Sequence, residues 1–265
     1  MKTTGRFVCA WRNRLALPAG LLCALVAGAW ATTNPPAPYA TRLWQMEDGL
    51  PHTIVQAITQ TRDGYLWVGT REGLARFDGV TFHSLTAKDF GTGLMQPSVR
   101  CLCEAPDRSL WIGTENVGLF RLKDGKLARV TREDGLRDGM INGLAATSDG
   151  SLWVAAGGLG QLRGGKLQYP FEKEVKGDVT SLFLDSDGVL WILGANVKQL
   201  KARKVTSYAP AKGRSLGAPK CLVSDRSGTV WAGDSGGLFC VKAGVAAYYD
   251  KSAGVTGIVG AVLPD

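Results

Sequence analysis

One serine in the sequence stands in a pattern that could support nucleophilic catalysis. The stretch GDSGG at residues 233–237 places Ser235 between an aspartate and two glycines. A serine nucleophile needs a histidine that accepts its proton and a carboxylate that orients that histidine. His52 and His83 are the only histidines of the chain, and neither stands in a matching motif. The pattern therefore suggests acyl transfer without supplying the residues that this chemistry requires.

Other stretches with potential chemistry also lack essential parts. DSDG at residues 185–188 begins like a calcium-binding loop, but Asn196 stands where that loop needs a glutamate. GGLG at residues 157–160 does not have the spacing of a phosphate-binding glycine loop. Cleavage of a glycosidic bond needs a positioned pair of carboxylates, and no spacing singles out such a pair. The sequence therefore predicts no cofactor, no metal site and no catalytic residue.

Composition and charge exclude several classes of protein. The chain has 265 residues, of which 45% are hydrophobic and 20% are charged, which is typical of a globular protein. Glycine occurs 35 times, which predicts many tight turns and short strands. The formal net charge is +8, but residues 1–31 carry half of it and the remainder is mixed along the chain. This distribution argues against a dedicated nucleic-acid-binding protein.

The N-terminal residues have the pattern of an export signal. Residues 1–14 are basic, residues 15–31 are apolar, and Ala29 and Ala31 form a small-x-small cleavage pattern. A Pro-rich linker follows at residues 32–40. A retained membrane anchor is the alternative, but seventeen apolar residues are short for a span and Pro18 interrupts them. We therefore expect residues 1–31 to be a signal peptide that is removed on export.

The cysteines do not form a metal-binding pattern. Cys9 and Cys23 lie in the leader, and Cys101 and Cys103 share one face of an expected strand. No CxxC motif occurs and no histidine lies nearby, which argues against zinc. Export would permit disulfides. We favour buried, apolar thiols for Cys101, Cys103, Cys221 and Cys240 over disulfide bonds.

One phrase returns five times along the chain. The copies are TRDGYLWVGT (61–70), APDRSLWIGT (105–114), TSDGSLWVAA (147–156), DSDGVLWILG (185–194) and DRSGTVWAGD (225–234). Their tryptophans are Trp67, Trp111, Trp153, Trp191 and Trp231, separated by 44, 42, 38 and 40 residues. A large ring repeated once per unit is interpreted as structural, filling the space between neighbouring units. The even spacing predicts a repeat architecture.

Each unit is expected to contain four short strands. In the first unit these are residues 54–59, 65–70, 74–77 and 80–85, separated by glycine-containing turns. Units of about 40 residues with four antiparallel strands are typical of the blades of a β-propeller. The sequence therefore predicts an all-β propeller fold over residues 41–265 with five full blades. In this alignment GDSGG is the turn between the second and third strands of the fifth blade.

The repeated unit resembles that of a known family. DGYLWVGTREGLARFDG at residues 63–79 and WQMEDGLP at residues 44–51 are similar to the two-component regulator propeller repeat. The resemblance extends over residues 41–265, and it departs from the family pattern in the fourth unit, where LGAN stands at residues 193–196. It implies a seven-bladed propeller in the extracytoplasmic sensor region of a bacterial signalling protein. A membrane helix and a cytoplasmic output domain, such as a kinase, usually follow.

Both ends of the repeat region look like parts of further blades. Residues 41–46 align with the outermost strand of a blade, and residues 259–265 align with an innermost strand. Five blades and two single strands would leave an incomplete ring with unpaired edges. We therefore expect the native protein to continue past residue 265. A natural five-bladed protein is the alternative.

Loops on one face of a propeller are the expected place for recognition. Loops between strands two and three, and between one blade and the next, share that face, and loops carry function more often than the scaffold does. Their polar groups would suit a hydroxyl-rich or zwitterionic ligand. The candidates for ligand binding are His52, Arg71, Glu72, Glu115, Asn116, Arg137, Asn142, Asn196, Asp234 and Ser235. For each of them the competing interpretation is a solvated loop residue.

Together these features predict a non-catalytic, ligand-binding sensory module. The resemblance implies the periplasmic part of a membrane-bound two-component-type signal transduction protein. Its partners would be an unknown small molecule or glycan and, in the full-length protein, a second copy. A free secreted propeller that acts as a binding or scaffold protein is the first alternative. An exported glycan-active enzyme is the second.

Overall fold

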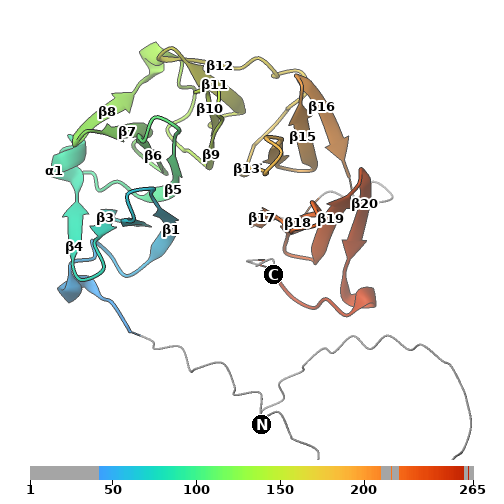
Figure 1. Cartoon of the computed structure of the whole chain (residues 1–265), viewed down its shortest axis with the longest axis horizontal. Helices are drawn as coiled ribbons and strands as arrows, with labels where there is room; N and C mark the ends of the chain where they lie inside the picture. The colour runs from blue at the N-terminus through green and yellow to red at the C-terminus, as the bar shows by residue number, and fades with distance from the viewer. Residues whose placement is uncertain (1–41, 210–215, 217–220, 260–261, 263–265) are drawn as a thin grey trace, which may run out of the picture. The chain divides into compact units, whose positions relative to one another are not determined.

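The structure is a computed structural model that describes residues 42–209, 216, 221–259 and 262. The predicted signal peptide and linker lie outside the described residues. A compact unit spans residues 43–265. Its described part contains five separate four-stranded antiparallel sheets, which we number 1 to 5 in chain order (Figure 1). The predicted all-β propeller fold with five full blades is therefore confirmed.

The first three sheets follow the sequence repeat closely. Sheet 1 contains β1 (Val55–Gln60), β2 (Leu66–Thr70), β3 (Gly73–Phe77) and β4 (Phe82–Leu85). Sheet 2 contains β5 (Val99–Glu104), β6 (Leu110–Thr114), β7 (Leu119–Lys123) and β8 (Lys126–Val130). Sheet 3 contains β9 (Gly143–Ala146), β10 (Leu152–Ala155), β11 (Leu159–Arg163) and β12 (Lys166–Gln168).

The last two sheets have the same plan, and the helices are short. Sheet 4 contains β13 (Ser181–Leu184), β14 (Leu190–Leu193), β15 (Val197–Lys201) and β16 (Lys204–Tyr208). Sheet 5 contains β17 (Cys221–Ser224), β18 (Val230–Gly233), β19 (Leu238–Lys242) and β20 (Val245–Tyr249). The helical segments are α1 (Ala87–Phe90) and the 3-10 helices η1 (Met46–Asp48), η2 (Arg132–Asp134) and η3 (Lys251–Ala253). None of the described helices has the length and apolar character needed to cross a bilayer.

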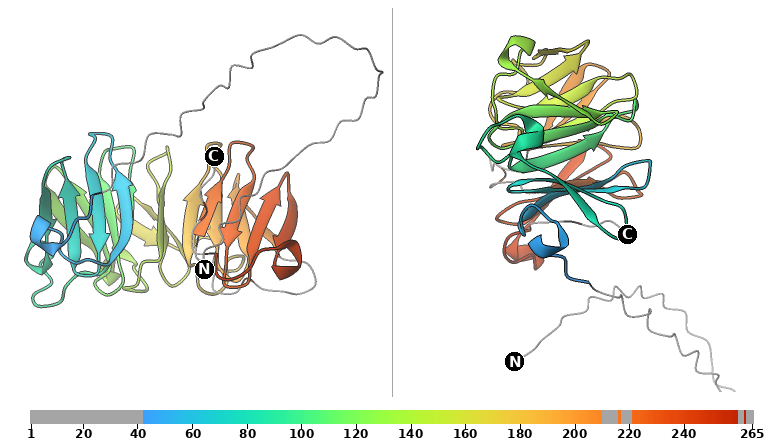
Figure 2. Two further views of the ribbon diagram at one scale, coloured as in Figure 1. Left: turned by 90° about the horizontal axis from the view of Figure 1, so that it is seen from below. Right: turned by 90° about the vertical axis from the view of Figure 1, so that its left-hand side faces the viewer.

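The sheets contact one another through their first strands. β1 contacts β5, β5 contacts β9, β9 contacts β13, and β13 contacts β17. Within each sheet the four strands are hydrogen-bonded in chain order, so the fourth strand is the outermost (Figure 1). The strands of all five sheets lie roughly along one common axis, with neighbouring strands running in opposite directions, and the connections gather at the two ends of the strands (Figure 2). We call the end with the strand two-to-three loops and the sheet-to-sheet connections the loop face. The opposite end is the turn face.

The repeated tryptophans fill the spaces between sheets, as the sequence predicts. Trp67 lies in the apolar cluster shared by sheets 1 and 2, Trp111 in that of sheets 2 and 3, Trp153 in that of sheets 3 and 4, and Trp191 in that of sheets 4 and 5. Their exposed fractions lie between 5% and 9%. Trp231 in sheet 5 is half-buried and lies 6.3 Å from the Tyr249 ring, centroid to centroid. The rings are therefore part of the scaffold.

The first turn of each blade is closed by its own side chains. In sheet 5 the carboxylate of Asp225 accepts hydrogen bonds from the Trp231 Nε1 at 2.9 Å, the Ser227 amide at 2.9 Å and the Thr229 amide at 3.0 Å. Donors around a carboxylate stabilise its charged form. The bond from Trp231, followed by that from Ser227, lowers the pKa of Asp225 from 3.8 to about 2.

Acid is therefore expected to weaken this turn. Because the folded-state pKa lies below the unfolded value, the stabilisation is present above about pH 4 and is lost as the pH falls towards about 2. The thermal unfolding midpoint of Asp225→Asn should be lower than that of the wild type at neutral pH. It should also fall less between about pH 5 and pH 2. Asp187→Asn is the control, because the Asp187 carboxylate has no hydrogen bond among the described residues. If Asp225→Asn kept the acid dependence of the wild type, this assignment would be wrong.

The expected outer strand at residues 41–46 is not a strand in the part that the structure describes. Residues 42–45 have no regular structure, and η1 follows. The Trp44 ring lies edge-on to Phe77 at 5.0 Å and to Phe82 at 5.4 Å, and the Gln45 amide donates to the Asp48 carboxylate at 2.8 Å. These contacts direct the chain into a 3-10 turn against sheet 1. The expected strand at residues 259–265 lies mostly outside the described residues.

The four cysteines of the described part are free thiols. Cys101 and Cys103 pack against the cluster between sheets 2 and 3. Burial raises the pKa of Cys101 to about 12 and also raises the pKa of Cys103. A protonated thiol in such a place behaves as a small apolar group. The favoured interpretation of apolar thiols agrees with this arrangement.

Candidate functional site

The two kinds of loop on the loop face are tied to each other by backbone hydrogen bonds. The Arg71 amide donates to the Ile54 carbonyl at 3.2 Å, and the Glu115 amide donates to the Ser98 carbonyl at 2.8 Å. The Asn142 amide donates to the Ala155 carbonyl at 2.9 Å in sheet 3. Each bond joins a sheet-to-sheet connection to the strand or loop beside it. The sequence-derived grouping of these loops on one face therefore agrees with the structure.

The Arg137 side chain is held in place by two other side chains. It lies on the connection between sheets 2 and 3, and its guanidinium stacks 3.9 Å from the centroid of the Tyr169 ring. It also forms an ion pair with Glu172, with a shortest distance of 2.8 Å. Hydrogen bonding raises the pKa of Arg137 and lowers that of Glu172, while burial raises the pKa of Tyr169. These side chains border a cleft of about 210 Å³ that also has Gly157 and Lys176 in its wall.

Glu115 and Asn116 surround the start of β5. The Glu115 carboxylate accepts from the Ser98 hydroxyl at 3.1 Å and lies 3.6 Å from the Arg100 guanidinium. The Asn116 side chain accepts from the Ser98 amide at 3.2 Å and donates to the Gln96 carbonyl at 2.9 Å. Asn116 also borders a second cleft of about 390 Å³, which residues of the 131–139 connection line as well. The structure thus brings these two predicted residues together.

The other predicted residues of this face include two that form hydrogen bonds within one connection or between two connections. The His52 Nδ1 accepts from the Ile54 amide at 2.9 Å, and Ile54 is also the partner of the Arg71 backbone. The Asn142 side chain donates to the Val179 carbonyl at 3.2 Å. Glu72 is exposed at the β2–β3 loop, and Asn196 is half-buried in the β14–β15 loop, where its carbonyl accepts from the Gly194 amide at 3.2 Å.

The GDSGG stretch is the β18–β19 turn that the repeat predicts. Asp234 is only 2% exposed, and its carboxylate accepts from the amides of Gly236 at 2.8 Å and Gly237 at 2.7 Å. The Tyr248 hydroxyl donates to the same oxygen at 2.8 Å. Ser235 is exposed at the tip of the turn. The Asp234 carboxylate therefore holds its own turn, and of these two candidates Ser235 is the one that faces solvent.

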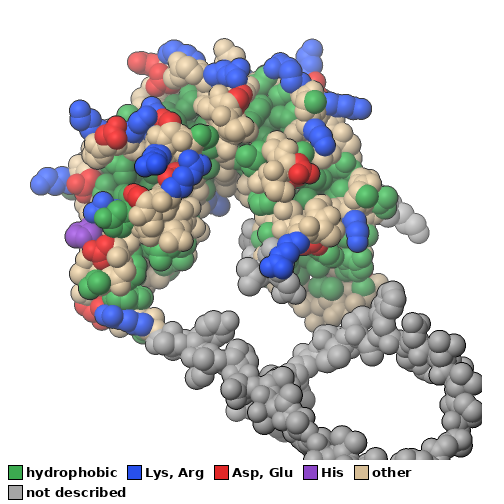
Figure 3. All heavy atoms as spheres, in the orientation of Figure 1, with side chains coloured by type: hydrophobic (Ala, Val, Ile, Leu, Met, Phe, Trp, Pro, Cys, Tyr) green, Lys and Arg blue, Asp and Glu red, His purple; other side chains and the backbone are tan. Residues whose placement is uncertain are grey.

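The ten predicted residues are distributed over all five sheets and do not converge on one pocket. The described residues also contain no cluster of three histidine, cysteine, aspartate or glutamate side chains that could hold a metal ion. Basic and acidic side chains are mixed over the face shown in Figure 3, and many basic ones stand at the outer edge of the sheets. A ligand of the loop face would therefore meet separate polar clefts.

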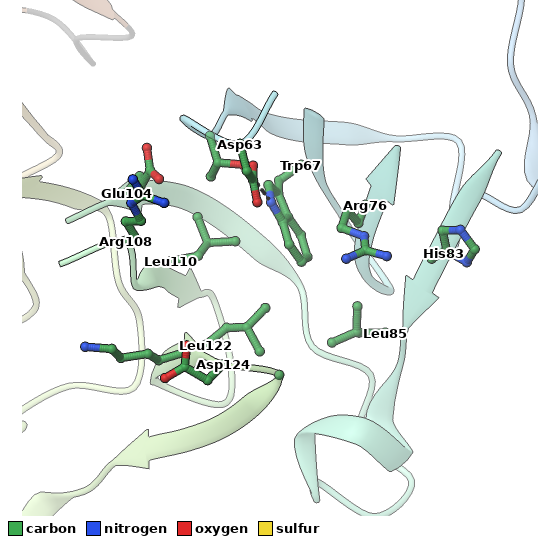
Figure 4. Close-up of a pocket in the computed structure, with 13 residues that line it drawn as sticks. Asp63, Trp67, Arg76, His83, Leu85, Glu104, Arg108, Leu110, Leu122 and Asp124 are labelled. Carbon is green, nitrogen blue, oxygen red and sulfur yellow. Dashed lines mark hydrogen bonds between the residues drawn. The ribbon is translucent and has the colours of Figure 1, made fainter. Parts of the chain in front are cut away.

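A larger cavity lies on the turn face, between sheets 1 and 2, where the sequence analysis placed no site. It has a volume of about 480 Å³. Its apolar wall is formed by Trp67, Leu85, Leu110 and Leu122. Figure 4 shows the Trp67 ring between Arg76 on one side and Leu110 on the other. The cavity is thus a contact region of two blades, and residues distant in sequence form it.

Charged side chains of both signs line this cavity. The basic ones are Arg76, His83, Arg108 and Lys123, and the acidic ones are Asp63, Glu104 and Asp124. Among them, Glu104 accepts from the Arg62 backbone amide at 3.1 Å, Lys123 lies 2.9 Å from Asp107, and His83 lies 3.6 Å from Asp78. The sequence signal that could have indicated the cavity is Arg108, which replaces the glycine of the repeated turn.

The comparisons with known proteins give the same repeat and the same fold. Residues 49–72 and 93–116 match the family model described as two component regulator propeller. The curated proteins include no match to the chain.

Among solved structures, the extracellular domain of the hybrid two component system BT3049 from B. thetaiotaomicron is similar, with a TM-score of 0.64 and 22% identity. The alignment covers 79% of this chain and 31% of that one. The extracellular domain of the one component system BT4673 from the same organism has a TM-score of 0.63 and 19% identity, with coverages of 76% and 30%. The chain therefore spans about a third of the length of these two structures.

An enzyme shares the architecture as well. Virginiamycin B lyase from Staphylococcus aureus has a TM-score of 0.59 and 15% identity, and the alignment covers 76% of this chain and 71% of the lyase. At such identities the likeness concerns the fold alone, because one fold hosts many functions. The repeat match is the more specific observation, and it falls on sheets 1 and 2. The chain is therefore a β-propeller protein in which two segments match the two component regulator propeller model.

Proposed function

We propose that the chain is the periplasmic sensory module of a membrane-bound two-component-type signal transduction protein. The match of residues 49–72 and 93–116 to the two component regulator propeller model carries this proposal. The fold likeness to extracellular domains of signalling systems supports it. In this role the module binds a small molecule or glycan, performs no chemistry itself, and acts as part of a homodimer of the full-length protein.

The location of the native protein tests this role. An antibody raised against the propeller should detect the full-length protein in the membrane fraction of the source cells. Protease added to spheroplasts should digest the antibody-reactive part, because the module faces the periplasm. Chemical cross-linking of the same membranes should give a dimer. Recovery of the protein from the culture medium would instead establish the free secreted alternative.

The surroundings of the possible nucleophile support binding rather than catalysis. Ser235 stands beside Asp234, whose carboxylate accepts hydrogen bonds from the amides of the same turn. His52 is hydrogen-bonded to its own loop, and His83 lies on β4 next to Asp78. A serine mechanism needs the histidine within hydrogen-bond reach of the serine. Neither His52 nor His83 lies in the β18–β19 turn with Ser235.

For the loop face we propose the Arg137 cleft as the main point of ligand contact. Arg137 presents a guanidinium that is held between the Tyr169 ring and Glu172, so little side-chain entropy remains to be lost on binding. The Tyr169 hydroxyl donates to the Ala156 carbonyl at 2.9 Å, which fixes the ring under the guanidinium. Guanidinium and carboxylate groups side by side suit the hydroxyl groups of a sugar.

Arg137→Ala is expected to weaken ligand binding by about 10- to 100-fold, because each hydrogen bond to a charged group contributes about 1.5–3 kcal/mol. A panel of neutral oligosaccharides is first screened for the one that raises the thermal unfolding midpoint of the wild type most. Calorimetric titration with that oligosaccharide then measures the affinity of each variant. Arg163→Ala is the matched control. Arg163 also forms an exposed ion pair, with Asp149 at 2.7 Å, but it lies on the turn face.

Loss of either exposed ion pair should cost at most about 1 kcal/mol of folding stability, so both variants remain folded. Unchanged affinity in Arg137→Ala, or an equal loss in Arg163→Ala, would contradict the assignment of this cleft.

A further inference from the structure

The cavity between sheets 1 and 2 contains a guanidinium that its own blade does not neutralise. Arg76 faces Trp67 across the β2–β3 pair, just as Arg121 faces Trp111 across the β6–β7 pair. In sheet 2 the Asp107 carboxylate binds Arg121 and closes the corresponding position. The same position is open in sheet 1.

In sheet 1 both Arg76 and the corresponding aspartate have other partners. Asp63, which corresponds to Asp107, accepts a hydrogen bond from the Thr61 hydroxyl at 2.6 Å and one from the Tyr65 amide at 3.4 Å. Arg76 instead lies over the Tyr65 ring, with its central carbon 4.5 Å from the ring centroid. Among the described residues Arg76 forms no ion pair and no hydrogen bond through its side chain. Stacking on an aromatic ring leaves the N–H groups in the plane of the guanidinium available.

A second arginine of the cavity occupies a conformationally costly position. The first turns of the other four sheets have glycine here, at Gly64, Gly150, Gly188 and Gly228, all with positive φ. Sheet 2 has Arg108 instead, with a φ of 64°. An L-residue with a side chain is strained in this conformation, whereas glycine is not. Arg108 lines the cavity, and within the described part its side chain has no ion pair. A strained residue that points into a cavity is a reason to consider a binding role.

The walls of the cavity indicate the chemical character of the rest of the ligand. Trp67 and Leu110 are 8% and 3% exposed and contribute rigid apolar surface, and Leu85 and Leu122 complete the wall. Figure 4 shows Arg76 and Trp67 directed into the same space. A volume of about 480 Å³ lies in the range of small-molecule sites, which are mostly apolar with a few polar groups that fix orientation. An anionic group would pair with Arg76 while a ring occupied the apolar part.

We propose that this cavity is a binding site for a small cyclic organic carboxylate, with Arg76 as the partner of its carboxylate. The ring of the ligand packs against Trp67 and Leu110, and Arg108 adds positive charge to the cavity from the opposite blade. The site lies on the turn face and uses none of the residues of the Arg137 cleft. The proposal therefore goes beyond the loop-face function, and either of the two can fail without the other.

The test is calorimetric titration of the whole chain with four probes. Phenylacetate carries both a carboxylate and an apolar ring and should bind. Phenylacetamide has the ring without the charge, acetate has the charge without the ring, and glucuronate has the charge on a polar ring. All three should bind at least about tenfold more weakly than phenylacetate, because each lacks one of the two features. Equal binding of phenylacetate and phenylacetamide, or no binding of phenylacetate, would overturn the proposal. Tighter binding of glucuronate than of phenylacetate would also overturn the proposal, because it would show that the site prefers a sugar acid to an apolar ring.

Two variants introduce residues that other blades already have at the corresponding positions, so both are expected to fold. Arg76→Gln introduces the residue found at the same register in sheets 3 and 4, Gln161 and Gln199, and should reduce phenylacetate affinity about 10- to 100-fold. Arg108→Gly introduces the glycine of the other four turns and should reduce the affinity severalfold while raising the unfolding midpoint. Arg163→Gln, in the cavity between sheets 3 and 4, should leave the affinity unchanged. Wild-type affinity in Arg76→Gln would refute the assignment.

Discussion

Trp153→Ala is expected to lower the free energy of unfolding by about 3–5 kcal/mol, the typical cost of removing a buried aromatic side chain. Trp153 is 7% exposed and belongs to the apolar cluster between sheets 3 and 4, together with Leu182 and Leu190. Its ring lies 6.0 Å from that of Phe171, centroid to centroid. Truncation would leave a cavity between two sheets whose backbones are held by their own strand pairing, so collapse around it would be limited. Urea unfolding followed by circular dichroism measures the change.

Trp153→Phe is the appropriate comparison for this position. Trp153 makes no side-chain hydrogen bond among the described residues, so the substitution changes ring size without leaving a polar partner unpaired. It should cost less than half as much as Trp153→Ala. A wild-type unfolding midpoint in Trp153→Ala would show that the repeated tryptophan does not join neighbouring blades.

Gly113→Ala is expected to destabilise the protein by about 1–3 kcal/mol through overpacking at the contact of sheets 2 and 3. Gly113 lies in the fully buried strand β6. A Cβ atom at this position would collide with the Cys101 sulfur, and it would lie 2.7 Å from the Ile141 Cγ2 and 2.9 Å from the Ile141 Cβ. Ile141 has no exposed surface, so it cannot turn away without disturbing the next blade. Chemical unfolding of the purified chain gives the change.

Gly139→Ala is the matched control for this effect. Gly139 also has a φ that other residues adopt, but a Cβ atom there would meet only the Asn116 carbonyl oxygen, at 3.8 Å. Its substitution should change stability by less than about 0.5 kcal/mol. Ile141→Ala combined with Gly113→Ala should cost less than the sum of the two single changes, because the new methyl group would occupy vacated space. Additive costs would locate the strain elsewhere.

The repeated tryptophan shows what the sequence by itself determined. Trp153 and its four equivalents recur with their turn residues at even spacing, because each blade closes its first turn with the same backbone hydrogen bonds and pairs its second strand with the first and the third. Strand two, its preceding turn and the structural role of the tryptophan are local properties of about forty residues, repeated five times. Local patterns of this kind predicted the five four-stranded sheets and the GDSGG turn.

Only the tertiary structure decided which side chains remain available for a ligand. The sequence could place Asp234 on a loop, but its burial depends on Tyr248 from another strand and on the backbone of its own turn. It could align Arg76 with Arg121, but it could not show that Arg121 pairs with Asp107 while Arg76 stacks on Tyr65 and has no acidic partner among the described residues. The outer strand expected at residues 41–46 was wrong for the same kind of reason, because Trp44 packs across sheet 1. A repeat pattern treats corresponding positions of the blades as equivalent. Three-dimensional packing gives these positions different hydrogen bonds and ring contacts, so the pattern cannot predict which side chains remain available.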